Sequence, residues 1–219
     1  MACRCVRSSS QNLTIASNTA FQFGTGDFAL AMQVNPESLV TGATPSTAFS
    51  AIISVGRFDD GVLFRYNSTA AGVAQESFYI KGTGYAWQPA NYLAVGSWLP
   101  IVITRIGSTV NVYANGASVL TVTNSADISP TTNTSIGAST HTTLENWDGF
   151  IAEVAIWKGA GLTAAEALAL SRGFTADQIR PQSLSFYAPL VRNFQDVRSG
   201  LAITNNNSAT VAVHPRIIT

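Results

Sequence analysis

The chain has 219 residues, of which 46% are hydrophobic and only 11% are charged, and its twelve basic residues balance its twelve acidic residues. A neutral chain offers no basic surface to nucleic acids or to anionic membranes, so we expect neither as a partner. The length and apolar content suit one large β-sandwich, and we expect a single domain over residues 1–219.

The only cysteines are Cys3 and Cys5, and they are too close together for an unstrained disulfide in an extended chain. We therefore expect two free thiols. The first residues lack the continuous apolar stretch of a secretion signal, which predicts synthesis without secretion. We interpret residues 1–12 as an N-terminal arm.

Three segments of the first half alternate between apolar and polar residues, as half-buried strands do. The apolar positions are Phe28, Leu30, Met32 and Val34; Phe49, Ala51, Ile53 and Val55; and Val62, Phe64 and Tyr66. A turn at Asp59–Gly61 predicts that the second and third segments form a hairpin.

A three-stranded meander is predicted next, from Ile101–Ile106, Thr109–Tyr113 and Val119–Thr123. Its second turn contains Asn115-Gly116, a pair that tolerates the two positive φ angles of a tight hairpin.

A long strand is predicted over Asp148–Trp157. Strict alternation there would place two sets of side chains on opposite faces. These sets are Phe150, Ala152, Val154 and Ile156 on one face and Ile151, Glu153, Ala155 and Trp157 on the other.

The C-terminal third begins with one short helix, predicted over Leu162–Gly173 because Thr163 and Glu166 form a capping box. A further turn is expected at Thr175–Gln178. Strand patterns in Leu184–Leu190 and Val211–Val213 then predict that residues 174–219 close or extend the sandwich. The runs Thr131–Ser135 and Asn205–Ser208 are interpreted as surface loops.

These elements predict an all-β fold, a two-sheet antiparallel β-sandwich with one short helix. Several segments together resemble the laminin-G-like, concanavalin-A-like jelly-roll family over residues 13–173, the core of the domain. The resemblance rests on Phe21–Phe28, Trp98–Arg105, Val112–Gly116, Ser135–Gly137 and Gly149–Trp157, followed by the helix. Leu184–Leu190 is similar to a stretch that often opens such domains, so we expect a departure from the usual strand order.

That family contains lectin-like modules, adhesion domains and phage-particle components, some of them calcium-dependent. Low charge, many Ser, Thr and Asn residues and no disulfide framework look most like the phage members. The resemblance thus implies a location in the virion, after synthesis in the host cytoplasm. It also implies other virion proteins and further copies of the chain, as a homo-oligomer, for partners.

Catalysis is not expected. Glu145, Asp148 and Glu153 do not match the paired carboxylates of the related glucanases. Asp148 is expected to shape the turn before Gly149, and Glu153 to reach a polar partner between the sheets. His141 and His214, the only histidines, have no triad partner and are interpreted as surface residues.

No cofactor is predicted. Calcium would need about 6–8 oxygen ligands, and the best acidic pair, Asp59 and Asp60, is interpreted as part of a turn. Candidate ligand-binding residues are three aromatic residues, Tyr85, Trp87 and Tyr92, which could form a platform for a sugar ring or anchor a loop. Trp98 and Trp157 are interpreted as core residues.

Two function hypotheses follow. The first is a non-enzymatic virion component, either a capsid-decorating or a tail-associated protein, that acts through protein–protein assembly. The alternative is a carbohydrate-binding host-adhesion module that uses the segment from Tyr85 to Tyr92.

Overall fold

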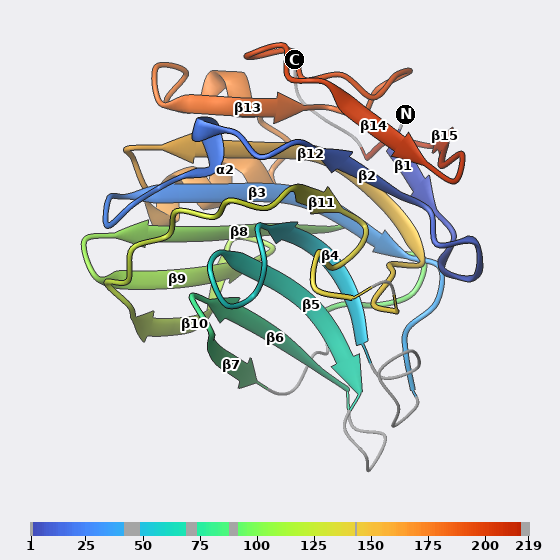
Figure 1. The fold of residues 1–219 in the computed structure, drawn as a ribbon, viewed down its shortest axis with the longest axis horizontal. Coiled ribbons are helices and arrows are strands. Elements are labelled where there is room, and N and C mark those ends of the chain that lie inside the picture. The colour runs from blue at the N-terminus through green and yellow to red at the C-terminus, as the bar shows by residue number, and fades with distance from the viewer. Residues whose placement is uncertain (1, 42–48, 69–73, 88–91, 143, 216–219) are drawn as a thin grey trace.

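The computed structural model describes residues 2–41, 49–68, 74–87, 92–142 and 144–215, and Figure 1 shows two antiparallel sheets packed into a sandwich. Sheet A has the order β10-β9-β8-β3-β12-β1-β15, with β13 also paired to β12. Sheet B has the order β14-β2-β11-β4-β5-β6-β7. The all-β sandwich predicted from the sequence is confirmed.

The strands of sheet A are β1 (Ala2–Cys5), β3 (Phe28–Pro36), β8 (Leu99–Ile106), β9 (Thr109–Ala114), β10 (Ala117–Thr123), β12 (Gly149–Lys158), β13 (Leu184–Ala188) and β15 (Thr210–Ala212). The strands of sheet B are β2 (Asn12–Ile15), β4 (Phe49–Val55), β5 (Val62–Ser68), β6 (Ala74–Ile80), β7 (Thr83–Trp87), β11 (Thr134–Ile136) and β14 (Ile203–Asn206). The helical segments are α2 (Ala164–Ser171) and the 3₁₀ turns η1 (Arg7–Ser9), η2 (Thr19–Phe21) and η3 (Ala176–Gln178).

The main core lies between the sheets and is filled by the alternating apolar residues of β3 and β5, as their period of two predicts. Leu30, Met32 and Val34 belong to it, as do Phe64 and Tyr66. The β4–β5 hairpin and the β8–β9–β10 meander form as expected.

Strict alternation fails in β12 because a bulge interrupts its pairing with β3 between Ala152 and Ala155. Glu153 lies in the bulge with a φ of 54°. Ile151, Val154 and Ile156 therefore all face the main core, and Phe150 does not, so the predicted two-face assignment was wrong across this point.

The bulge also divides one edge of β12 between two partners. Gly149–Ile151 pair with β1, and Val154–Trp157 pair with β13. Residues 2–5 are thus a strand inside sheet A, where the sequence analysis expected an arm. Cys3 and Cys5 are free, fully buried thiols with sulfur atoms 3.6 Å apart. The hydrogen bond to the Cys3 thiol, together with burial, raises the pKa of Cys5.

A buried arginine joins the opening of β3 to β8. The Arg105 guanidinium donates hydrogen bonds to the carbonyl oxygens of Gly24, Gly26 and Ala126 at 2.5–3.0 Å, and it lies over the Phe28 ring. These contacts satisfy its donors inside the protein, which explains how a charged side chain stays fully buried. Burial lowers its pKa.

The outer face of sheet A is covered by the segment from Leu162 to Ile179, which contains α2 and η3. Thr163 and Glu166 form the predicted capping box, with Thr163 N donating to Glu166 Oε2 at 2.8 Å. Leu170 and Ala176 pack with Trp157 into a second apolar cluster. Trp157 is fully buried, as predicted, but Trp98 is only half-buried, so its assignment to the core was wrong.

Candidate functional site

The outer face of sheet B is polar, whereas its inner face is apolar. Alternation along each strand produces this difference, because Leu13 and Ile15 enter the core while Asn12 and Thr14 point outward. The other strands contribute similar outward residues, namely Ser54, Arg65, Asn67, Gln75, Ser77, Ser135 and Tyr79. No helix of the described chain covers this face (Figure 1).

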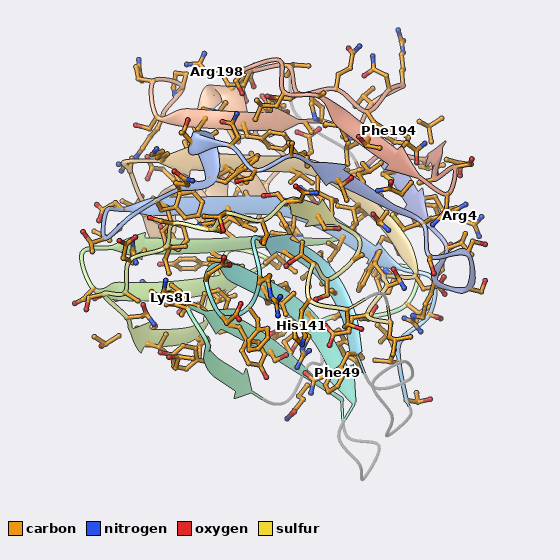
Figure 2. All side chains as sticks on the ribbon, viewed as in Figure 1. Arg4, Phe49, Lys81, His141, Phe194 and Arg198 are labelled. Atoms are coloured by element: carbon orange, nitrogen blue, oxygen red, sulfur yellow. The ribbon has the colours of Figure 1, made fainter. Side chains whose placement is uncertain are left out.

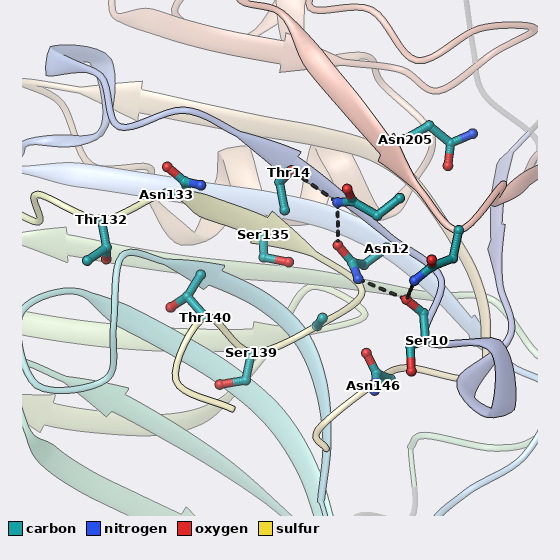
Figure 3. Close-up of a pocket in the computed structure, with 13 residues that line it drawn as sticks. Ser10, Asn12, Thr14, Thr132, Asn133, Ser135, Ser139, Thr140, Asn146 and Asn205 are labelled. Atoms are coloured by element: carbon teal, nitrogen blue, oxygen red, sulfur yellow. Dashed lines mark hydrogen bonds between the residues drawn. The ribbon is translucent and has the colours of Figure 1, made fainter. Parts of the chain in front are cut away.

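This face contains a hollow of about 730 Å³, which we call the polar hollow (Figure 3). Three regions distant in sequence form it: residues 10–14, residues 132–140 together with Asn146, and residues 205–207. The lining residues are Ser10, Asn12, Thr14, Thr132, Asn133, Ser135, Ala138, Ser139, Thr140, Asn146, Asn205, Asn206 and Asn207. The volume lies within the range of about 300–1,000 Å³ that is usual for ligand pockets.

Hydrogen bonds among the lining residues hold one wall in place. Asn206 Nδ2 donates to Asn12 Oδ1 at 2.9 Å and to Thr14 Oγ1 at 3.1 Å. The amides of Asn12 and Asn207 both donate to the carbonyl oxygen of Ser10 (Figure 3). β14 and β2 are thus joined through side chains as well as through their backbone ladder.

The lining residues are all uncharged, and all but one carry a side-chain hydroxyl or amide. Hydroxyl and amide groups both donate and accept hydrogen bonds. A ligand rich in hydroxyl groups also donates and accepts hydrogen bonds. Because such a ligand is neutral, no charged group has to leave water when it enters the hollow. The chemistry of the polar hollow therefore fits a neutral, polyhydroxylated ligand.

A second, smaller pocket of about 190 Å³ lies on the same face over β5 and β6, and we call it the ring pocket. Phe58, Tyr79 and His141 surround it with rings; the Phe58 centroid lies 5.9 Å from that of Tyr79 and 4.6 Å from that of His141. Arg65 and Glu145 complete it as a buried ion pair, 2.7 Å from Arg65 Nη1 to Glu145 Oε1.

The three predicted ligand-binding aromatics lie away from both pockets. Tyr85 is half-buried and stacks on the core residue Phe78, with ring centroids 6.2 Å apart. Tyr92 packs against the core, and its hydroxyl donates to Glu76 Oε2 at 3.1 Å. Trp87 ends β7, where its backbone pairs with Glu76, but its side chain lies outside the described residues. Their sugar-binding role stays a prediction.

The candidate carboxylates are engaged by three separate sets of partners. Glu145 pairs with Arg65. Asp148 accepts from the backbone N–H of Arg7 and from the Ser38 hydroxyl, so its side chain joins segments distant in sequence, and its expected role in the turn before Gly149 stays a prediction. Glu153 contacts Tyr187 and His214 at the outer cluster of sheet A, so its expected place between the sheets was wrong.

The two histidines differ in their surroundings. His141 is exposed, as predicted, and Arg57 Nη2 donates to its Nδ1 at 3.0 Å. The interpretation of His214 as a surface residue was wrong, because its side chain is only 10% exposed and lies 2.9 Å from Glu153 Oε1.

No group of three or more His, Cys, Asp or Glu side chains suited to a metal ion occurs within the described residues. Of the acidic pair weighed for calcium, Asp60 accepts the backbone N–H of Arg57 within the β4–β5 turn, and Asp59 pairs with Arg57 at 3.4 Å. Over the described part of the chain, helices long and apolar enough to cross a membrane are absent.

The sequence analysis noted two of the segments that form the polar hollow but missed the hollow itself. Thr131–Ser135 and Asn205–Ser208 were interpreted as loops, but Thr134–Ile136 form β11 and Ile203–Asn206 form β14. Both strands pair with β2, which brings the two Asn- and Thr-rich runs to either side of Asn12 and Thr14.

Two facing antiparallel sheets with a short helix define an all-β sandwich of the jelly-roll class. Residues 7–167 match the model of the concanavalin A-like lectin/glucanases superfamily, and the chain belongs to that superfamily. No curated protein matches the sequence.

Solved structures share the fold at low sequence identity. A Bacteroides ovatus protein provisionally described as carbohydrate-binding is 14% identical with a TM-score of 0.64; the match covers 96% of this chain but only 61% of that protein. The heptameric SAP-like pentraxin of Limulus polyphemus is 13% identical with a TM-score of 0.64, over 93% of this chain and 89% of the pentraxin.

A third structure was determined with a bound sugar. It is domain 4 of an extracellular arabinanase from Geobacillus stearothermophilus in complex with arabinotriose, 18% identical with a TM-score of 0.50, over 73% of this chain and 72% of that domain. At these identities the likeness concerns the fold.

Proposed function

We propose that this chain is a non-enzymatic carbohydrate-binding module that holds a neutral oligosaccharide in the polar hollow of sheet B. The observation that carries the proposal is the uncharged lining of this hollow, built from hydroxyl and amide groups. The superfamily and the carbohydrate-related descriptions of two structural neighbours support it.

The wall of the hollow is prearranged for such a ligand. The hydrogen bonds between β2 and β14 fix Asn12 and Asn206 before any sugar arrives, which lowers the entropy cost of binding. Ser135, on β11, lies at the centre of the polar hollow. A larger side chain at this position therefore tests whether a ligand needs to enter the hollow.

The arrangement of the carboxylates supports binding without turnover. Retaining glycoside hydrolysis needs two carboxyl groups about 5–5.5 Å apart on either side of the bond to be cleaved. Glu145 lines the ring pocket and pairs with Arg65, whereas the described lining residues of the polar hollow include no Asp or Glu.

A glycan array tests the proposal with the wild type, Ser135→Tyr and a matched control, Ser118→Tyr. Ser135→Tyr places a ring in the hollow without entering the core, and Ser118→Tyr places the same ring on the exposed surface of β10. We expect the wild type and Ser118→Tyr to bind the same neutral oligosaccharides and Ser135→Tyr to lose at least tenfold in affinity. Equal binding by all three proteins would remove the hollow as the site.

A second candidate function is assembly, as a capsid-decorating or tail-associated component of a phage virion that forms a homo-oligomer. Its support is the low charge of the chain and an apolar groove on the outer side of sheet A. Trp98 and Phe150 form the groove floor, with ring centroids 6.3 Å apart, and Val95 and Val213 are 57% and 79% exposed beside it.

Sedimentation at increasing protein concentration tests this second candidate. Association that Val213→Asp abolishes, together with the chain's presence in purified particles by mass spectrometry, would support it. If the protein is a monomer at every concentration and is absent from the particles, carbohydrate binding remains the one proposed function.

A further inference from the structure

The ring pocket on sheet B has the features of a built binding site. Phe58 comes from the β4–β5 turn, Tyr79 from β6, and His141 from the segment between β11 and β12. The planes of Tyr79 and His141 are both nearly perpendicular to that of Phe58, at 80° and 79°. Figure 2 shows His141 in front of the strands of sheet B.

Arg65 is fixed at the side of this pocket. Its Nε donates to Ser77 Oγ at 3.1 Å, Nη1 to Glu145 Oε1 at 2.7 Å, and Nη2 to the Tyr79 hydroxyl at 3.2 Å. Its guanidinium carbon also lies 3.9 Å from the centroid of the Phe49 ring. The guanidinium group is therefore held by partners on every side and has little freedom to turn toward a ligand.

Glu145 is only half satisfied. Its side chain is 6% exposed and Oε1 is bound to Arg65, but Oε2 is buried and has no hydrogen-bond partner among the described residues. A buried carboxylate oxygen without a donor costs free energy, so it identifies a place where a hydrogen-bond donor fits. Because Glu145 borders the ring pocket, a ligand in that pocket could supply the donor.

The charges nearby favour a neutral donor. Glu145 is neutralised by Arg65, and Arg57, which donates to His141, lies 3.4 Å from Asp59. A cationic ligand would meet the Arg65 guanidinium beside the acceptor, whereas a hydroxyl group would not be repelled.

We propose that the ring pocket binds a single neutral monosaccharide unit, with one sugar hydroxyl donating to Glu145 Oε2 and the C–H surface of the sugar ring against Phe58 and Tyr79. The volume of about 190 Å³ equals roughly six water molecules in the liquid, the size of one sugar unit. Aromatic rings beside a few fixed polar groups are a common way to orient such a ligand.

The ring pocket adds an end-unit subsite to the carbohydrate-binding function proposed above, and it rests on that function. The segment from Ala138 to Asn146 links the two sites, because Ser139 and Thr140 line the polar hollow while His141 and Glu145 line the ring pocket. A glycan chain lying across this segment would place its end unit in the ring pocket.

Saturation-transfer NMR with the methyl glycosides of glucose, galactose, mannose and N-acetylglucosamine tests the subsite. We expect at least one glycoside to bind the wild type, and its affinity to fall at least fivefold in Glu145→Gln and in Phe58→Ala. Phe58→Ala leaves the Arg65–Glu145 pair in place, so it reports on the pocket even if Glu145→Gln fails to fold. Glu37→Gln, on the surface ion pair with Arg4, is the matched control and should bind as the wild type does.

Ser135→Tyr separates this proposal from the previous one, since it fills the hollow and leaves the ring pocket open. Binding of a methyl glycoside that survives Ser135→Tyr and is lost in Phe58→Ala supports the subsite, even if no oligosaccharide binds the hollow. If oligosaccharides bind and no methyl glycoside does, or if both pocket variants bind as the wild type, the subsite is wrong and the hollow stands. Methylammonium bound in place of the glycosides would overturn the neutral-ligand assignment.

Discussion

The two sheets show the same alternation on their inner faces but opposite outer faces. Sheet A places Ala31, Val102 and Trp157 outward, and α2 and η3 bury them in a second apolar cluster. Sheet B places Asn12 and Thr14 outward, and the hollow leaves them accessible. One outer face therefore serves stability, and the other is free to bind a ligand.

The largest effect should come from opening the covered face of sheet A. Trp157 is fully buried, and its Nε1 donates to the carbonyl oxygen of Ile179 at 2.8 Å. Trp157→Ala should lower the free energy of unfolding by about 3–5 kcal/mol, because it leaves a large cavity under the helix. Urea denaturation measures this loss.

Trp98→Ala provides the matched control on the same sheet. Trp98 is half-buried at the surface groove, so its removal should cost clearly less than the removal of Trp157. Equal losses would show that the covered and uncovered parts of sheet A do not differ in energy as proposed.

The pattern of the strands made much of this fold predictable, since period-two alternation depends on neighbours in sequence. It identified the core residues of β3 and β5, the hairpins, and the helix from its capping box. It could not reveal the bulge at Glu153, because a bulge has no signature in apolar spacing. Consequently Phe150 was assigned to the same face as Val154 and Ile156, although only the latter two face the core.

The candidate site was hidden for a different reason. The polar hollow joins residues near position 12 with residues near positions 135 and 206, and only the order β14-β2-β11 brings them together. Local patterns carry no information about which strands become neighbours. Tyr85 and Tyr92 were predicted to bind a ligand because aromatic rings often pack against sugars, yet both rings pack on the core.

A second prediction concerns a carboxyl group on the inner side of sheet B. Glu76 is 1% exposed, and burial raises its pKa to about 7. Because its folded-state pKa exceeds the value of 4.5 expected when unfolded, stability should fall as pH rises from about 4.5 to 7, by about 3 kcal/mol in total. Glu76→Gln should remove this slope, so it should match the wild type at about pH 4 and exceed its stability at about pH 8.

Thermal unfolding of both proteins across this range measures the effect. Glu37→Gln removes a surface carboxylate and keeps Glu76, so it serves as the control and should show the same slope as the wild type. If the stability of the wild type depended on pH as little as that of Glu76→Gln, the result would contradict the burial of a carboxylate at position 76.

A smaller effect is expected at the start of the covering helix. Thr163 Oγ1 accepts the backbone N–H of Glu166, so Thr163→Ala leaves that donor unsatisfied and should cost about 1 kcal/mol. Thr204→Ala, at an exposed position of β14, is the comparison and should change the free energy of unfolding by less than about 0.5 kcal/mol. Chemical denaturation measures the loss in free energy of unfolding for each variant. A larger loss for Thr204→Ala than for Thr163→Ala would argue against the role of Thr163 as a helix cap.

The smallest of these effects on stability should accompany a measurable loss of binding. Asn206→Ala removes the amide that bridges Asn12 and Thr14 but leaves the core intact, so it should cost about 1 kcal/mol or less in stability. Its affinity for the array-selected oligosaccharide, measured by calorimetry, should fall severalfold. Unchanged affinity would show that the Asn206 amide takes no part in binding the oligosaccharide.

The most direct measurement of the central claim is an NMR titration that follows the side-chain amides of the asparagines with the array-selected oligosaccharide. If the outer face of sheet B is the binding face, the amide signals of Asn12, Asn133 and Asn205–Asn207 should shift, while the indole signals of Trp98 and Trp157 stay in place. Shifts confined to the Trp98 indole or to the Tyr85–Tyr92 segment, with the asparagine amides unmoved, would contradict it.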